Sequence, residues 1–101
     1  MYTLNVSGYA YTGANVGDDL SYHSGYAFST YDQDNDISSG NCAQIYDGAW
    51  WYKYCYKSNL NGLNNGDGNS ASTGIKWNDF SSYSLKTVYM AIKAGADDSG
   101  E

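Results

Sequence analysis

Asp32, Asp34 and Asp36 alternate with amide side chains in one short polar stretch of the chain. Carboxylates crowded in this way repel one another unless something neutralises them. Calcium takes about six to eight oxygen ligands from carboxylates, carbonyls and water, and the backbone carbonyls of Ser38 and Gly40 lie within reach of such a loop. The spacing therefore predicts a Ca²⁺ site, although a solvated acidic turn without a metal accounts for the same pattern.

The chain has two cysteines, Cys42 and Cys55, and one histidine, His23. Two thiols and a single imidazole are too few ligands for a structural zinc site, and the cysteines do not have the Cys-x-x-Cys spacing of a redox pair. The remaining interpretations are a disulfide and two buried free thiols. We favour the disulfide because it would stabilise so small a domain by about 3 kcal/mol. It predicts an oxidising, extracellular compartment.

The charged residues do not predict an enzyme. A catalytic histidine needs a nucleophile and an orienting partner, and the serines that flank His23 in sequence do not establish either. Glycosidase carboxylates must face each other across a cleft. Here six of the eleven acidic residues lie in one loop or in the C-terminal tail, which does not place a pair on opposing walls. We therefore expect a recognition or structural protein without catalytic residues.

Length and composition favour one small folded domain. The chain has 101 residues, of which 17% are aromatic, with twelve tyrosines and three tryptophans. Disordered chains are poor in aromatic residues, so an aromatic core is expected. The net charge of −6 disfavours nucleic acid, whose phosphates require a basic face, and disfavours a polybasic membrane patch. No apolar run approaches the ~20 residues of a membrane-spanning helix, so no membrane insertion is expected.

The elements that must position these residues are short. Alternating apolar and polar residues, or β-branched and aromatic residues, predict strands at 2–7, 75–77 and 84–93, with one more short strand within 22–30. A polar loop at 32–40, an aromatic core at 41–56, and a long irregular loop at 59–74 lie between the strands, and an acidic tail follows at 94–101. We expect residues 1–93 to form the domain. The fold class is α+β: a small, loop-rich domain with a short antiparallel sheet, the calcium loop and one disulfide.

Several motifs, which follow one another in the same order along the chain, resemble the fibrinogen-related domain. This is the fibrinogen-like C-terminal domain found in ficolins, tachylectins and the fibrinogen chains. The resemblance extends to about Lys93 and corresponds to the C-terminal half of that domain, which is usually about twice this length. It is carried by the segments Phe28-Ser29-Thr30-Tyr31-Asp32-Gln33-Asp34-Asn35-Asp36, Asn41-Cys42-Ala43, Gly48-Ala49-Trp50-Trp51-Tyr52, Ser58-Asn59-Leu60-Asn61-Gly62, Gly74-Ile75-Lys76-Trp77 and Tyr83-Ser84-Leu85-Lys86.

The resemblance implies how the acidic loop and the cysteines are used. It implies a Cys42–Cys55 disulfide and a secreted protein. Its calcium ligands map to the side chains of Asp34 and Asp36 and to the backbone carbonyls of Ser38 and Gly40. Asp32 then lies outside the direct ligand set.

The resemblance also implies a ligand pocket beside the second cysteine, at a cis peptide that would here be Tyr54-Cys55. Backbone N–H groups near Cys55 and Tyr56 would face an acetyl oxygen, and aromatic side chains, Tyr46 among them, would surround the acetyl methyl group. Lectins of the family usually carry histidine where this chain has Tyr56. The chain also has no aromatic residue in 69–73, where family lectins usually have one.

The sequence therefore predicts a calcium-dependent, lectin-like module that binds acetylated glycans or glycoproteins of the N-acetylhexosamine type. The alternative is a structural or adhesive module that contacts proteins and uses calcium only to hold its fold. Residues 2–7 are expected to present an unpaired strand edge, which is a route to a homo-oligomer.

Overall fold

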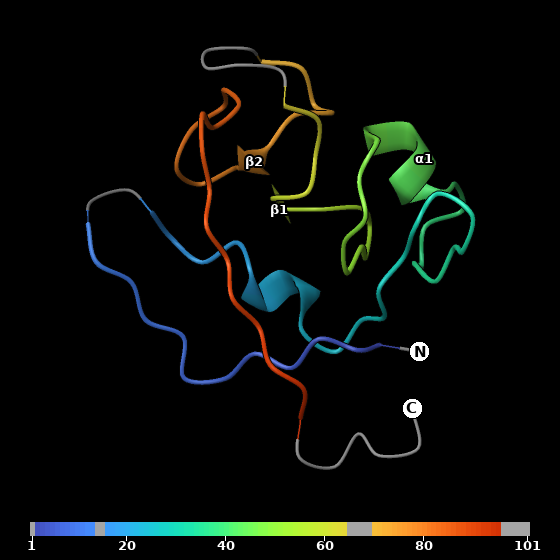
Figure 1. Cartoon of the computed structure of the whole chain (residues 1–101), viewed down its shortest axis with the longest axis horizontal. Coiled ribbons are helices and arrows are strands. Elements are labelled where there is room, and N and C mark those ends of the chain that lie inside the picture. Colours follow the sequence, from blue (N-terminus) through green and yellow to red (C-terminus); the bar gives the residue numbers. More distant parts are fainter. Residues whose placement is uncertain (1, 14–15, 65–69, 96–101) are drawn as a thin grey trace.

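The computed structural model of the protein describes residues 2–13, 16–64 and 70–95. The regular elements in these residues are the 3-10 helix η1 (Ser21–His23), the helix α1 (Cys42–Tyr46), and the strands β1 (Ser58–Asn59) and β2 (Lys76–Trp77). β1 and β2 pair antiparallel, with Ser58 opposite Trp77 and Asn59 opposite Lys76. Figure 1 shows this small sheet in the middle of the molecule, with α1 beside it. No helix in the described part of the chain is long and apolar enough to cross a bilayer.

Helix α1 is short because both of its ends are specified by local chemistry. The side-chain oxygen of Asn41 accepts a hydrogen bond from the backbone N–H of Gln44 at 3.2 Å, which caps the first turn. Asp47 adopts a left-handed backbone with φ of 56° and ends the helix after Tyr46. The helix therefore holds Cys42 at its buried beginning and Tyr46 at its other end.

The core is built from consecutive aromatic residues, as the sequence predicted for 41–56. Trp50 and Tyr52 are completely buried and Trp51 is 8% exposed. The rings of Trp50 and Trp51 meet edge to face, with their centroids 5.0 Å apart. Leu4, Cys42 and Ala43 complete this buried cluster.

Of the four expected strands, the one within 75–77 is confirmed, those at 2–7 and within 22–30 are confirmed only in part, and the one at 84–93 is wrong. β2 confirms a strand within 75–77. Residues 2–7 and 22–30 form a single bridge, between Thr3 and Ala27, in place of continuous strands. Residues 84–93 form no strand, and residues 86–95 are all exposed. Alternating apolar residues need a neighbouring strand. Leu85 donates one backbone hydrogen bond to Ile75, and from Lys86 onward no described residue exchanges a backbone hydrogen bond with the segment.

The remaining expectations concern segments that are described only in part. Residues 65–69 of the loop predicted at 59–74 lie outside the described residues, and β1 already includes the first residue of that loop, Asn59. Residues 96–101 of the expected acidic tail also lie outside them. The boundary after residue 93 stays a prediction.

Candidate functional site: an acidic loop, a disulfide and an aromatic recess

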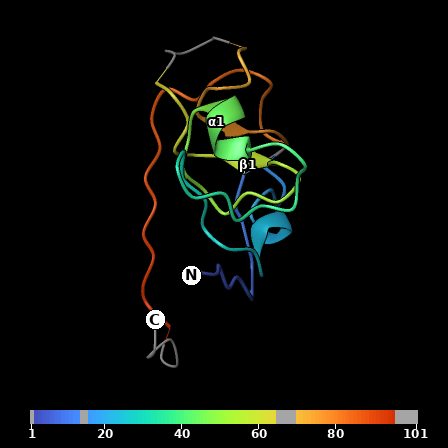
Figure 2. The same cartoon turned by 90° about the vertical axis from the view of Figure 1, so that its right-hand side faces the viewer.

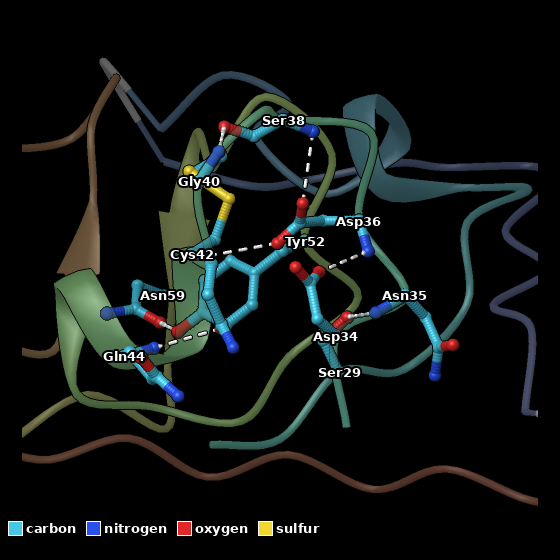
Figure 3. Close-up of a disulfide and its surroundings, with 12 residues drawn as sticks. Ser29, Asp34, Asn35, Asp36, Ser38, Gly40, Cys42, Gln44, Tyr52 and Asn59 are labelled. Atoms are coloured by element: carbon cyan, nitrogen blue, oxygen red, sulfur yellow. Dashed lines mark hydrogen bonds between the residues drawn. A yellow bond between two sulfur atoms is a disulfide. The ribbon is translucent and has the colours of Figure 1, made fainter. Parts of the chain in front are cut away.

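The acidic loop is a series of side-chain to backbone turns. The Asp34 carboxylate accepts from the backbone N–H of Asp36 at 3.1 Å, and the Asp36 carboxylate accepts from that of Ser38 at 3.0 Å. The Ser38 hydroxyl accepts from the N–H of Gly40 at 3.2 Å. Each turn spans two residues, which the alternation of short polar side chains favours. Figure 3 shows the Asp34 and Asp36 carboxylates pointing toward each other under the loop.

Asp36 also connects the loop to α1. Its second oxygen accepts a hydrogen bond from the backbone N–H of Cys42 at 2.9 Å. Burial raises the pKa of Asp36 above its ordinary value, and the nearby Asp34 carboxylate raises it further, against the hydrogen bonds from Cys42 and Ser38. Two carboxylates held together in this way favour a positively charged neighbour.

The four predicted calcium ligands are compatible with a metal. Within the described residues, the carbonyl oxygens of Ser38 and Gly40 accept no hydrogen bond and so keep their lone pairs free. The predicted ligand set consists of these two carbonyls and of two carboxylates, those of Asp34 and Asp36. No group of three or more His, Cys, Asp or Glu side chains that could hold a metal gathers among the described residues. Asp32 is exposed, and its carboxylate accepts from the Thr30 hydroxyl at 2.9 Å.

The loop is anchored to the buried core at its start. The Asn35 backbone N–H donates to the hydroxyl of buried Ser29, and the Asn35 side chain donates to the carbonyl of Phe28, both at 2.9 Å. Ser29 in turn bridges to Trp50. These contacts fix the position of the loop relative to the tryptophans, and no motif or spacing in the sequence predicted them.

The cysteines form the expected disulfide between Cys42 and Cys55, with Cα atoms 5.5 Å apart. This resolves the alternative of two free thiols in favour of the bond. The Tyr54–Cys55 peptide is cis, as the resemblance implies. The bond therefore joins the first residue of α1 to the segment that follows the buried tryptophans.

His23 holds the same segment from the other side. Its Nδ1 lies 2.8 Å from the Trp51 carbonyl oxygen, and its Nε2 accepts from the backbone N–H groups of Lys57 and Ser58 at 3.1 and 3.3 Å. This pattern requires a neutral ring with the proton on Nδ1. Burial lowers the pKa of His23 to about 4, and the nearby Lys53 charge acts in the same direction. His23 therefore links the Trp51 carbonyl to the start of β1 through its two ring nitrogens.

A surface recess of about 240 Å³ lies next to the disulfide. The structure brings all four predicted ligand-binding residues to its lining, together with two residues that the sequence did not single out. The lining residues are Tyr46, Tyr54, Cys55, Tyr56, Ser72 and Asn78.

Two tyrosines form the aromatic side of this recess. The rings of Tyr46 and Tyr56 meet edge to face, with centroids 5.0 Å apart. The Tyr56 hydroxyl donates to the carbonyl of Ser72 at 2.6 Å, which ties it to the loop ahead of β2. Burial raises the pKa of Tyr56, so the phenol stays protonated and keeps this donor near neutral pH. The sequence does not single out Ser72, because its place in the recess depends on a contact with Tyr56, which lies 16 residues away in the chain.

The backbone of the recess offers unused donors. The N–H groups of Cys55 and Tyr56 donate no hydrogen bond within the described part of the chain, whereas the next two residues, Lys57 and Ser58, donate to His23. An aromatic wall beside free N–H groups can bind a small ligand that has both a carbonyl oxygen and an apolar group.

Comparison with known proteins now identifies the family. Residues 1–95 match the family described as the C-terminal globular domain of fibrinogen beta and gamma chains. This chain belongs to the fibrinogen-like domain family. Solved relatives agree: over 71% of this chain, the fibrinogen-like globe domain of human ANGPTL2 is 44% identical in sequence, with a TM-score of 0.67.

Similar fibrinogen-like proteins come from several animals. Tenascin-R of Rattus norvegicus is 44% identical over 94 residues, which is 92% of this chain and 6% of that protein. Techylectin-5A of Tachypleus tridentatus is 42% identical over 96 residues, which is 92% of this chain and 32% of that protein. Microfibril-associated glycoprotein 4 of Bos taurus is 45% identical over 95 residues, which is 91% of this chain and 36% of that protein. The chain thus spans about a third or less of each of these relatives, and 36% of the ANGPTL2 structure.

Proposed function

We propose that this fibrinogen-like chain is an extracellular, calcium-binding recognition module for acetylated glycans of the N-acetylhexosamine type. The observation that supports it best is the recess, which is lined by Tyr46, Cys55 and Tyr56 and where the N–H groups of Cys55 and Tyr56 donate no hydrogen bond to any described residue. The similarity to a techylectin is in keeping with this function. The disulfide supports an oxidising, extracellular location.

Each part of an acetamido group has a counterpart in the recess. The N–H groups of Cys55 and Tyr56 would donate to the acetyl oxygen, which leaves no buried acceptor without a partner. The faces and edges of Tyr46 and Tyr56 would cover the methyl group. A single sugar buries little surface, so affinity on the order of millimolar is expected at each site. Useful binding would then come from several copies acting together.

Calcium would act on the loop that supports the recess. Asp34, Asp36, Ser38 and Gly40 would hold the ion, whose charge offsets the repulsion between the two carboxylates. Because Asp36 also accepts from the N–H of Cys42, a fixed Asp36 would keep the beginning of α1 in place. We therefore assign calcium a supporting role in ligand binding.

Titration calorimetry tests the glycan site. N-acetylglucosamine should bind in the millimolar range, whereas glucosamine, which lacks the acetyl group, should give no measurable heat. Tyr46→Ala should weaken binding at least about tenfold, because it removes half of the aromatic wall. Tyr31→Ala is the matched control, since the Tyr31 side chain is 67% exposed and does not line the recess. No heat from the wild type at tens of millimolar acetylated sugar would reject the glycan proposal.

Thermal unfolding tests the calcium site separately. If calcium is present at about ten times its dissociation constant, it should add about 1.4 kcal/mol to the free energy of unfolding and raise Tm. Asp34→Ala should abolish this increase. Asp32→Ala should retain it, because Asp32 is exposed, accepts from the Thr30 hydroxyl and is not one of the proposed ligands. A full calcium response in the Asp34 variant would show that the ion binds elsewhere.

A second candidate function is a structural or adhesive module in which calcium only stabilises the fold. It is favoured by the use of the Tyr56 hydroxyl on Ser72 and by the contact between the Tyr46 and Tyr56 rings, since both interactions occupy groups that a sugar would otherwise meet. The similarity to tenascin-R is in keeping with it. Protein capture that free N-acetylglucosamine does not displace would favour this function over the first.

A further inference from the structure

Asp19 is a buried carboxyl group outside the acidic loop and the recess. Its side chain is completely buried, which is rare for an aspartate unless the carboxylate is paired. Oδ2 accepts a hydrogen bond from the backbone N–H of Asp79 at 2.5 Å, whereas Oδ1 has no hydrogen-bond partner within the described residues. An ionised carboxylate that is buried with one oxygen unsatisfied is costly, so a proton or a cation at this oxygen would stabilise the fold.

The side chain that contacts Asp19 is a second carboxyl group, that of Asp79. The two side chains are within hydrogen-bonding reach of each other, and the charge of Asp79 disfavours a charge on Asp19. Gly17 leaves space for this contact, because a Cβ at that position would overlap the Asp79 carboxylate. Two ionised carboxylates have no proton to donate, so they can hydrogen-bond to each other only when one of them is protonated.

The carboxyl pair lies where residues 16–20, the connector that leads into η1, are attached to the two strands. The Asp19 carbonyl accepts from the hydroxyl of buried Ser58 in β1, and the Val16 carbonyl accepts from the indole N–H of Trp77 in β2, both at 2.8 Å. Figure 1 and Figure 2 both show η1 below the strands. The contact with Asp79 is a third attachment of the connector, and of these three it alone requires a proton.

The other titratable groups around Asp19 do not supply the missing positive charge. Lys57 attracts the Asp19 carboxylate, but its effect is smaller than the repulsion from Asp79, and its side chain is exposed. Asp18 is itself acidic, and its carboxylate accepts from two backbone N–H groups at the start of η1. Tyr9 is a neutral phenol whose hydroxyl donates to a carbonyl of the connector. The simplest neutralising group is therefore a proton.

We propose that Asp19 and Asp79 share one proton, and that this proton fastens the connector to the segment that follows β2. With the proton bound, the two carboxyl groups are joined by a hydrogen bond. When the proton passes to water, two negative charges repel each other across the same contact. Asn78, which lies between β2 and Asp79, lines the recess, so loss of the proton should also shift Asn78. This inference does not depend on the proposed glycan function.

The effect on stability has a definite sign. Burial raises the pKa of Asp19 above its ordinary value of 3.8 and the charge of Asp79 raises it further, against the hydrogen bond from the Asp79 N–H. The folded chain therefore keeps a proton at pH values where the unfolded chain has lost it. The contribution of the shared proton to stability is fully present below pH 3.8 and is lost as the pH rises through the folded pKa.

Carbon-13 NMR of the side-chain carboxyl groups, recorded against pH in the presence of a calcium chelator, tests the shared proton. In the wild type, Asp19 should titrate above the ordinary aspartate range, and the backbone amide of Asn78 should shift in the same pH interval. In Asp79→Asn, the second charge is absent and the new amide can donate to Asp19 without a proton. Asp19 should then titrate at lower pH, and the linked shift of Asn78 should move with it.

Asp32→Asn is the matched control, because it removes the same charge from another exposed aspartate that does not contact the pair. It should leave the titration of Asp19 unchanged. The Asp79 side chain is also exposed, so neither variant removes a core contact. Titration of Asp19 in the ordinary aspartate range, or at the same pH in wild type and Asp79→Asn, would overturn the shared proton. An Asn78 amide that does not follow Asp19 would overturn the link to the recess.

A calcium titration separates a proton from a cation. In Asp34→Ala, which lacks one proposed ligand of the acidic loop, added calcium should leave the carboxyl signals of Asp19 and Asp79 unchanged. A calcium-dependent shift of both signals in this variant would show that the pair holds a metal ion in place of the proton, and would overturn the proposal. Because the calcium-loop proposal is tested by the response of Asp34→Ala in thermal unfolding, the two proposals can fail independently.

Discussion

Acidification from pH 7 to pH 4 should lower the free energy of unfolding by about 3 kcal/mol through His23 alone. The ring is completely buried and is hydrogen-bonded to three backbone groups, the Trp51 carbonyl and the N–H groups of Lys57 and Ser58. Protonation would turn Nε2 from an acceptor into a donor, and the N–H groups of Lys57 and Ser58 would then face a second donor. The native fold therefore resists the proton, which is why the pKa of His23 falls to about 4.

The sign of the effect follows from the two pKa values. In the unfolded chain His23 binds a proton near its ordinary pKa of 6.5, whereas in the native chain it does so only near 4. Between these values the unfolded state binds more protons, so stability is fully present above pH 6.5 and is lost as the pH falls toward 4. Burial raises the pKa values of Asp19 and Asp36, so these groups act with the opposite sign and partly offset the loss.

Urea unfolding as a function of pH, compared between the wild type and His23→Gln, isolates this contribution. The variant should be less stable at pH 7 and should lack the steep decrease between pH 6.5 and 4. The chain has a single histidine, so an NMR titration of its ring provides a second measurement that needs no variant. A ring that titrates near 6.5 in the folded protein would contradict the proposed hydrogen bonding.

The acidic loop and the disulfide could be predicted because their residues are close in sequence. Asp34, Asp36, Ser38 and Gly40 interact through turns of two residues, so the spacing alone nearly determines the hydrogen bonds. Cys42 and Cys55 are the only cysteines. Their separation of 13 residues suits a small loop-closing bond.

Contacts between distant residues could not be predicted in this way. His23 bonds to Lys57 and Ser58, which lie 34 and 35 residues away, and no periodicity in the sequence indicates that pairing. Ser72 meets Tyr56 across the loop that follows β1 for the same reason. The described part of the chain has few regular elements. Side-chain hydrogen bonds between distant residues therefore connect segments that a larger sheet would connect through its backbone.

The expected strand at 84–93 was wrong for a different physical reason. The pattern describes which face of a segment is apolar, but a strand forms only where a partner supplies the other half of its hydrogen bonds. Leu85 reaches Ile75, and from Lys86 onward the described residues offer no such partner. The periodicity therefore indicates which face of the segment is apolar, and it does not identify a pairing partner.

Reduction of the Cys42–Cys55 bond should cost about 3 kcal/mol of stability, in line with the loop that it closes. The five-residue helix α1 is too short to be stable alone, and the sheet has two strands of two residues each. Regular hydrogen bonding therefore cannot replace the covalent link. Because the bond joins α1, which carries Tyr46, to the segment that carries Tyr56, its loss should also separate the two walls of the recess.

Urea unfolding followed by tryptophan fluorescence measures this effect, because Trp50 and Trp51 are buried and become exposed when the chain unfolds. The wild type should lose stability when a reducing agent is added. The double variant C42A/C55A should match the reduced wild type and should not respond to the reducing agent, which controls for effects of the reagent itself. A loss below about 1 kcal/mol would mean that Asp36, through its bond to the N–H of Cys42, and His23, through Lys57 and Ser58, already hold the two ends of the closed loop together. The covalent bond would then be secondary to the polar contacts around it.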